Sequence, residues 1–216
     1  MNIFFIDYET TGLNPYHDEP IEIAIKKIDE DNYYSSLIKP TFNGLHYGYI
    51  PPKINKLTGI SDKDIENNSK KYHDVTFDVI QYIKENSEEG PIYIVAHNGT
   101  TFDFIFFRKA IDNYNKEGGD GIQTRSSSLN MEIIQRFRYI DTLLMAKLLI
   151  KSDSVRQSNL CRMYNITNQS EHRSLGDVTS LEQIYKVICE HLSYLHRKEK
   201  DYYRMNPLEI ISKTYY

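Results

Sequence analysis

Acidic residues and one histidine are spaced along the chain so that they could act together as a metal site. Asp7 and Glu9 stand two residues apart at the end of an apolar run that predicts a buried strand, and alternate residues of a strand point to the same face. Asp103 falls in the first turn of a predicted helix. Asp177 opens another predicted helix, with His172 just before it. The sequence therefore offers several carboxylates and an imidazole at the ends of its elements.

Carboxylates in such a set suit a hard divalent cation. Mg²⁺ and Mn²⁺ prefer oxygen ligands and are commonly shared between protein carboxylates and a substrate phosphate. Four carboxylates are enough for two ions, and ions about 3.5 to 4 Å apart can stabilise both the attacking and the leaving oxygen of an in-line phosphoryl displacement. His172 could act as the general base, because imidazole titrates near neutral pH. The chemistry that these residues predict is phosphoryl displacement with two Mg²⁺ or Mn²⁺ ions.

Each acid also has a simpler structural interpretation. An Asp-x-Glu pair at a strand end is more often a solvated pair than a metal site. An acid in the first turn of a helix, such as Asp103 or Asp177, complements the helix dipole and caps free amides. These separate interpretations do not explain why all of these acids lie at element ends, together with a histidine and Gly/Asn-rich bends.

The elements that would carry these residues predict an α/β domain. Strands are expected at 2–6, 21–28, 33–39, 91–96 and 138–141. Helices are expected at 76–84, 102–114, 142–150 and 159–164, and a last amphipathic helix carries Val178, Leu181, Tyr185, Ile188 and Leu192 on a face that should pack against the sheet. The chain around 51–60 is expected to be irregular, and Ser61 with Asp64 predicts a capping box for a short helix.

Length and composition indicate one folded domain. The 216 residues fit a single core, and we expect residues 1–196 to form it, with 197–216 as a tail packed on or extending the same domain. The stretch 117–130 is expected to be a mobile surface loop. Apolar residues make up 40% of the chain, which excludes a disordered protein. A formal charge of -4 excludes a protein that coats nucleic acid by bulk attraction, so phosphate contacts must be local or carried by metal ions.

The sequence gives no sign of a membrane or secreted protein. Its apolar runs are far shorter than the roughly 20 residues of a membrane helix, and no signal peptide is recognised. Cys161 and Cys189 each lie in an apolar pattern, so we expect buried free thiols in a reducing compartment. The expected protein is soluble and intracellular, in the cytoplasm or nucleus, with no membrane partner.

Sequence motifs surround the acids. The first block is FIDYETTGL at 5–13, followed by IEIA at 21–24. The second is IVAHNG at 94–99, leading to FDF at 102–104, and the third is HRSLGDV at 172–178. In this order the blocks resemble the DEDDh exonucleases, the family of the proofreading subunit of bacterial polymerase III and of the three-prime repair exonucleases. The second and third blocks are most similar to the three-prime repair exonucleases.

The resemblance implies a ribonuclease H-like α/β fold, with a central mixed sheet (an antiparallel meander, then parallel strands) flanked by helices. It implies a 3′→5′ exonuclease that releases nucleoside 5′-monophosphates from DNA 3′ ends by two-metal-ion hydrolysis. Asp7, Glu9, Asp103 and Asp177 would hold two Mg²⁺ or Mn²⁺ ions, and His172 and Glu9 would be the catalytic residues, with His172 as the base. The expected partner is single-stranded DNA or the 3′ end of a duplex, and the chain could form a homodimer.

The resemblance also implies residues that contact the terminal nucleotide. Thr10 would present its backbone, Leu13 would wedge against the last base, and the other candidates are Leu57 or Ile60 as a second apolar wall and Asn98 and Phe102 lining the cleft. Each has a structural alternative, since Leu13 and Phe102 could be core residues, Asn98 a turn former and Thr10 a strand-end hydroxyl. The motif context favours the functional interpretation of Leu13 and Asn98.

Rival functions remain from the sequence. An exoribonuclease of the same fold would use the same metal chemistry and differ only in its contacts to the 2′-hydroxyl. A catalytically silent nucleic-acid-binding or polymerase-docking domain would lack part of the acid set, which is complete here. A proofreading subunit would require a polymerase partner that the sequence does not name.

Overall fold

The computed structural model describes residues 1–40, 50–117, 131–168 and 170–198. Its centre is a six-stranded sheet in the order β4-β3-β2-β1-β5-β6. The strands are β1 (Ile3–Thr10), β2 (Pro20–Lys27), β3 (Tyr33–Lys39), β4 (Lys70–Lys71), β5 (Ile92–Ala96) and β6 (Phe137–Asp141). β1, β2 and β3 form an antiparallel meander, and β5 and β6 continue the sheet parallel to β1. The predicted mixed sheet is confirmed.

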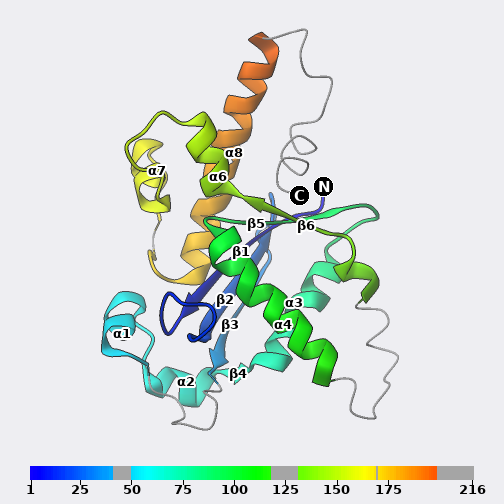
Figure 1. Ribbon diagram of the computed structural model, residues 1–216, viewed down its shortest axis with the longest axis vertical. Coiled ribbons are helices and arrows are strands. Elements are labelled where there is room, and N and C mark those ends of the chain that lie inside the picture. The colour runs from blue at the N-terminus through cyan, green and yellow to red at the C-terminus, as the bar shows by residue number, and fades with distance from the viewer. Residues whose placement is uncertain (41–49, 118–130, 169, 199–216) are drawn as a thin grey trace.

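Helices cover both faces of this sheet (Figure 1). They are α1 (Pro52–Thr58), α2 (Asp62–Asn68), α3 (Tyr72–Glu85), the short 3₁₀ helix η1 (Gly99–Thr101), α4 (Asp103–Glu117), α6 (Thr142–Leu149), α7 (Gln157–Met163) and α8 (Ser174–Lys198). One core cluster joins the sheet to α3 and α4. The other joins it to α6, α7 and α8, with Val178, Leu181, Tyr185 and Ile188 buried as the helical spacing predicts.

The alternation of side chains along β1 decides where its acids point. Phe4, Ile6 and Tyr8 pack in the core cluster under α3 and α4. Ile3 and Phe5 pack in the cluster under α8. Residues 7 and 9 have the same parity as 3 and 5, so β1 directs both of its carboxylates toward the α8 face.

The prediction of irregular chain around 51–60 is wrong for residues 52–58, which form α1. The pair Pro51-Pro52 is typical of a break in structure, but Pro52 occupies the first turn, where a helix needs no backbone N–H. The helix ends at Gly59, whose φ of 73° is the left-handed conformation that glycine adopts readily. The predicted capping box of the next helix is confirmed, since Ser61 and Asp64 each accept from the backbone N–H of the other.

Several expectations concern residues outside this description. The loop at 118–130 and the tail at 199–216 are not described, so the boundary at residue 196 stays a prediction. Both cysteines are free as expected, but only Cys161 is buried, while Cys189 is half-buried. Among the helices that are described, none is long and apolar enough to cross a membrane.

Candidate active site

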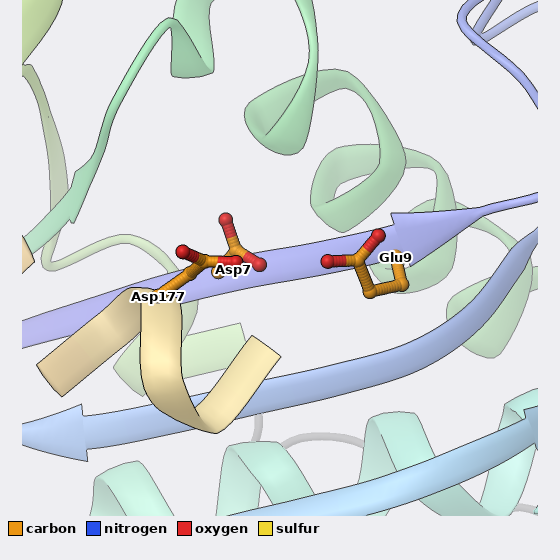
Figure 2. A group of neighbouring side chains, drawn as sticks. All are labelled: Asp7, Glu9 and Asp177. Atoms are coloured by element: carbon orange, nitrogen blue, oxygen red, sulfur yellow. The ribbon is translucent and has the colours of Figure 1, made fainter. Parts of the chain in front are cut away.

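Carboxylates from two distant segments meet at the end of β1. Asp7 and Glu9 of β1 and Asp177 in the first turn of α8 each offer an oxygen, and these oxygens lie within 4.8 Å of one another. Figure 2 shows the Asp177 carboxylate beside that of Asp7, with Glu9 further along the strand and turned to the same side. The fold therefore brings together three of the four predicted ligands. Asp7 and Asp177 are 170 residues apart in the chain.

Asp103 lies directly beside this cluster but is held differently. It is buried at the start of α4, and its Oδ1 accepts a hydrogen bond of 3.0 Å from the backbone N–H of Tyr8, between the two β1 acids. It is close enough to contribute to the raised pKa of both Asp7 and Glu9. Its oxygens are nevertheless outside the group whose mutual distances are within 4.8 Å.

The carboxylates of this site are hard to ionise as they stand. Burial is the first cause, and it raises the pKa of Asp7 well above its usual range, with further increases from Asp103 and Asp177. Burial and the charge of Asp177 raise the pKa of Glu9 to about 8. Burial also raises the pKa of Asp103 to about 7 and that of Asp177 to about 6. A divalent cation would favour the ionised forms, and an all-oxygen donor set fits Mg²⁺ or Mn²⁺.

Asp177 is oriented through both of its oxygens. Oδ1 accepts from Nδ2 of Asn168 at 2.7 Å, and Oδ2 accepts from the backbone N–H of His172 at 3.0 Å. These donors partly offset the effect of burial on the pKa of Asp177. Sequence reasoning missed Asn168, because an asparagine in irregular chain carries no periodic signal of its own.

His172 lies in the loop that leads into α8. Its backbone has a φ of 64°, a left-handed conformation in which histidine is more frequent than most residues. The half-exposed side chain lines the same cavity as Asp7, Glu9 and Asp177, with a volume of about 520 Å³. The structure thus places the predicted base and three of the predicted metal ligands around one space.

Comparisons with known proteins identify the family of the chain. The exonuclease family model RNase_T matches residues 4–185, which is most of the chain. The chain belongs to this exonuclease family. The family includes DEDDh-type enzymes, as the motifs predicted, and the finer similarity to the three-prime repair exonucleases stays a prediction.

Relatives of the chain include longer proteins. The PolC-type DNA polymerase III of Thermotoga petrophila is 30% identical over 188 residues, which cover 86% of this chain and 12% of the polymerase. The chloroplastic/mitochondrial exonuclease DPD1 of Arabidopsis thaliana is 25% identical, over 87% of this chain and 56% of DPD1. The chain therefore spans about an eighth of the length of the polymerase and about half of the length of DPD1.

Solved structures share the fold of the chain. E. coli exonuclease I in complex with a dT13 oligonucleotide superposes with a TM-score of 0.66 at 16% identity, covering 91% of this chain and 42% of that one. A zinc-bound form of its complex with single-stranded DNA gives a TM-score of 0.65 at 17% identity. Likeness at this level of identity establishes the ribonuclease H-like fold.

An ion pair between the buried Glu22 and the half-exposed Arg173 fastens the loop of His172 to the sheet. Glu22 of β2 is buried, and its carboxylate accepts from Nε of Arg173 at 3.1 Å and from the backbone N–H of Ser174 at 2.9 Å. Gly176 allows a close approach on the other side, since a Cβ there would lie 2.5 Å from the carbonyl oxygen of Ser170. Glu22 was named from the sequence only as part of a motif. An acid within the apolar run IEIAI does indicate a buried carboxylate, and a buried carboxylate needs a cation or hydrogen-bond donors.

A second carboxylate fixes the bend that leads to Asp103. Asp141, at the end of β6, accepts from the backbone N–H groups of Asn98 at 3.0 Å, Thr100 at 2.9 Å and Leu143 at 2.9 Å. Asn98 has a φ of 68°, and its exposed side chain accepts from the hydroxyl of Thr101. The geometry favours the turn-forming interpretation of Asn98, with Asp141 as the residue that holds the turn.

The remaining substrate candidates have different environments. Leu13 is 86% exposed and Leu57 is 47% exposed, so neither is a core residue. Ile60 is buried with Ile21, Ile50 and Ile65, which leaves Leu57 as the candidate for the second wall. Thr10 is buried and its hydroxyl donates to the carbonyl of Gly12, while Phe102 packs edge-on against Phe106. Neither Asn98 nor Phe102 is among the residues that line the cavity of His172.

Proposed function

We propose that the chain is a 3′→5′ exodeoxyribonuclease that removes nucleoside 5′-monophosphates one at a time from the end of a DNA strand. The observation that carries the proposal is the convergence of Asp7, Glu9 and Asp177 within 4.8 Å, on a cavity that His172 also lines. Membership of the exonuclease family supports the reaction class.

Asp7, Glu9, Asp103 and Asp177 would hold two Mg²⁺ or Mn²⁺ ions. Bound ions of this kind polarise a phosphodiester and lower the pKa of water. Because Asn168 and the N–H of His172 occupy both oxygens of Asp177, this carboxylate is held in one orientation. A fixed orientation reduces the reorganisation that ligand binding requires.

His172 would take the proton of the attacking water. The water oxygen bonds to the terminal phosphorus, the bond from phosphorus to the 3′-oxygen of the preceding nucleotide breaks, and that oxygen takes a proton from solvent. The Glu22–Arg173 pair keeps the loop of His172 against the sheet during this step. Thr10, through its backbone, and the exposed Leu13 in the loop after β1 would hold the terminal nucleotide, with Leu57 as a second apolar wall.

DNA is the proposed substrate because a structural neighbour of the chain was solved with a dT13 oligonucleotide. One experiment tests polarity, metal requirement and substrate. The purified chain is incubated with DNA strands labelled at the 3′ or the 5′ end, and with matched RNA strands, with Mg²⁺ or with a chelator. We expect immediate release of labelled mononucleotide from the 3′-labelled DNA, and progressively shorter strands from the 5′-labelled DNA. Loss of activity in chelator is expected. If the chain cleaves RNA much faster than DNA, the proposal of a DNA substrate is wrong.

A proofreading role is a second candidate, because PolC-type polymerases are among the relatives that match most of the chain. A proofreader acts together with a polymerase. Co-purification of the chain with a polymerase would favour this role, and full activity of the isolated chain on free strands would weaken it.

A further inference from the structure

The loop between β1 and β2 is built to keep a defined shape. It is the dark blue loop at the end of β1 in Figure 1. The N–H of Thr11 donates to the carbonyl of Glu19 at 2.9 Å, which closes the loop. Within it, the Asp18 carboxylate accepts from the N–H of Asn14 at 2.8 Å. At Gly12 a Cβ would lie 2.4 Å from the Asp18 carboxylate, so the turn packs too tightly for a side chain.

This rigid loop displays an aromatic ring to solvent. Tyr16 is 74% exposed, and Leu13 on the same loop is 86% exposed. Nζ of Lys109, from α4, lies 4.7 Å from the centroid of the Tyr16 ring and donates to the carbonyl of Pro15. Lys109 makes no ion pair with an acid in the described part of the chain. The loop therefore presents a ring and a positive charge side by side.

The ring and charge are connected to the active site along α4. Ile105 and Lys109 lie four residues apart, which places them on one side of α4. Both are partly exposed, as is Phe102, which precedes the helix. Asp103, beside the carboxylate cluster, lies at the start of the same helix. A strand with its 3′ end at Asp7 and Glu9 could therefore continue over this side of α4 to Tyr16.

We infer that Tyr16 and Lys109 form a second nucleotide subsite, in which the Tyr16 ring stacks on a base upstream of the nucleotide being removed and the Lys109 ammonium contacts a backbone phosphate. This inference rests on the proposed function. Stacking on an aromatic ring is tolerant of sequence, as a strand-degrading enzyme requires. In a chain of net charge -4, a cation held without an acidic partner is a local attraction for phosphate. Two exposed apolar side chains are too small an area for a stable protein interface.

The test separates the subsite from the chemistry by substrate length. The p-nitrophenyl ester of thymidine 5′-monophosphate contains a single nucleotide, whereas oligothymidylates of two to eight residues reach progressively further from the site. Tyr16→Ala should lower kcat/KM on the longer strands by about tenfold, because the stacking of one base on the ring is lost. Hydrolysis of the ester, which does not reach Tyr16, should be unchanged. Tyr16→Phe should retain most of the activity on strands, since the ring remains.

Tyr33→Ala is a matched control, because Tyr33 is a 47% exposed tyrosine at the far end of β3 from the acids. An abasic residue placed at successive positions of the strand identifies the base that stacks. At that position the abasic residue and Tyr16→Ala together should lower kcat/KM no further than either change alone. An equal loss on ester and strands, or no loss on strands, would overturn the subsite.

A binding measurement in chelator tests the subsite without turnover. The dissociation constant of fluorescent oligothymidylate should rise about tenfold in Tyr16→Ala. In Lys109→Gln the slope of log affinity against log salt should become shallower by about 0.7, the value for one phosphate contact on a single strand. Failure of the wild-type chain to hydrolyse either substrate with Mg²⁺ or Mn²⁺ would count against the proposed function. Unchanged binding by both variants would count against the subsite.

Discussion

Glu9 and Glu22 are the same residue type in directly opposed positions of β1 and β2, yet their environments differ. Glu22 accepts from Arg173 and from the N–H of Ser174. Glu9 accepts no hydrogen bond from the described residues, and its pKa is raised to about 8 by burial and by neighbouring acids. Like charges in opposed positions destabilise a sheet. Glu22 is therefore paired with a cation of the protein itself, whereas Glu9 is available as a candidate ligand for a metal ion.

The same division separates the other acids around the site. Asp141 is saturated by backbone N–H groups of three residues and serves a bend and a helix start. Asp7 lies among Asp103, Asp177 and Glu9, and burial together with these three charges raises its pKa. Environment, rather than residue type, distinguishes the acids that maintain the fold from those that are candidates for metal binding.

The strongest test of this contrast is Glu9→Gln. We expect kcat to fall by roughly 10³-fold or more, because a ligand to an ion that supplies several kcal/mol of transition-state stabilisation is lost. Stability in chelator should be unchanged or higher, since one charge is removed from a repulsive group. Activity and thermal unfolding of the same preparation check both effects. A marked loss of stability would show that Glu9 is a structural acid.

Metal removal and pH should have the next largest effect. The folded pKa of Glu9, about 8, lies above its unfolded value of about 4.3. The metal-free fold therefore binds an extra proton at Glu9 between these values, so the contribution of Glu9 to stability is fully present below about pH 4 and is lost as the pH rises to about 8. Mg²⁺ at a hundred times its Kd should add about 2.7 kcal/mol, or roughly 5 to 10 °C in Tm.

Thermal unfolding from pH 5 to 8.5, with Mg²⁺ and with chelator, measures this prediction. The stabilisation by Mg²⁺ should be largest at the alkaline end, where the carboxylates are most costly to keep ionised without it. Glu9→Gln should flatten the pH dependence in chelator. A Tm in chelator that rises steadily toward pH 8 would contradict the assignment of these acids.

Glu22→Gln should have the opposite signature to Glu9→Gln. It leaves Arg173 without its carboxylate, and we expect unfolding free energy to fall by roughly 2 kcal/mol, as for loss of charged hydrogen bonds. The stabilisation by Mg²⁺ should persist, because the oxygens of Asp7, Glu9 and Asp177 remain. Urea unfolding with and without Mg²⁺ checks this, and loss of the Mg²⁺ effect would place Glu22 among the ligands.

Ser61→Ala provides the smallest expected effect and a control for general destabilisation. It removes the capping box of α2, for which we expect about 1 kcal/mol of stability lost. Because Ser61 lies outside the cavity of the acids, kcat should not change. A similar fall of kcat in Ser61→Ala and Glu22→Gln would mean that activity follows stability rather than the position of the His172 loop.

The local pattern of the sequence predicted much of this molecule. The five predicted strands occur close to their expected positions, and the capping box at Ser61 is formed. Because the alternation of side chains along a strand depends only on neighbouring residues, the common face of Asp7 and Glu9 could be predicted as well. Local pattern failed at Pro52, where the same residue is compatible with a break or with the first turn of a helix.

Most of the elements, the positions of the acids at their ends and the family motifs could be recognised without a structure. Packing was needed to show which acids meet, that Asp103 turns one oxygen to the N–H of Tyr8, and that Glu22 rather than Glu9 receives Arg173. Periodicity depends on neighbours a few residues away, whereas the partner of a carboxylate depends on side chains brought together by packing. For Glu22 that partner lies 151 residues further along the chain.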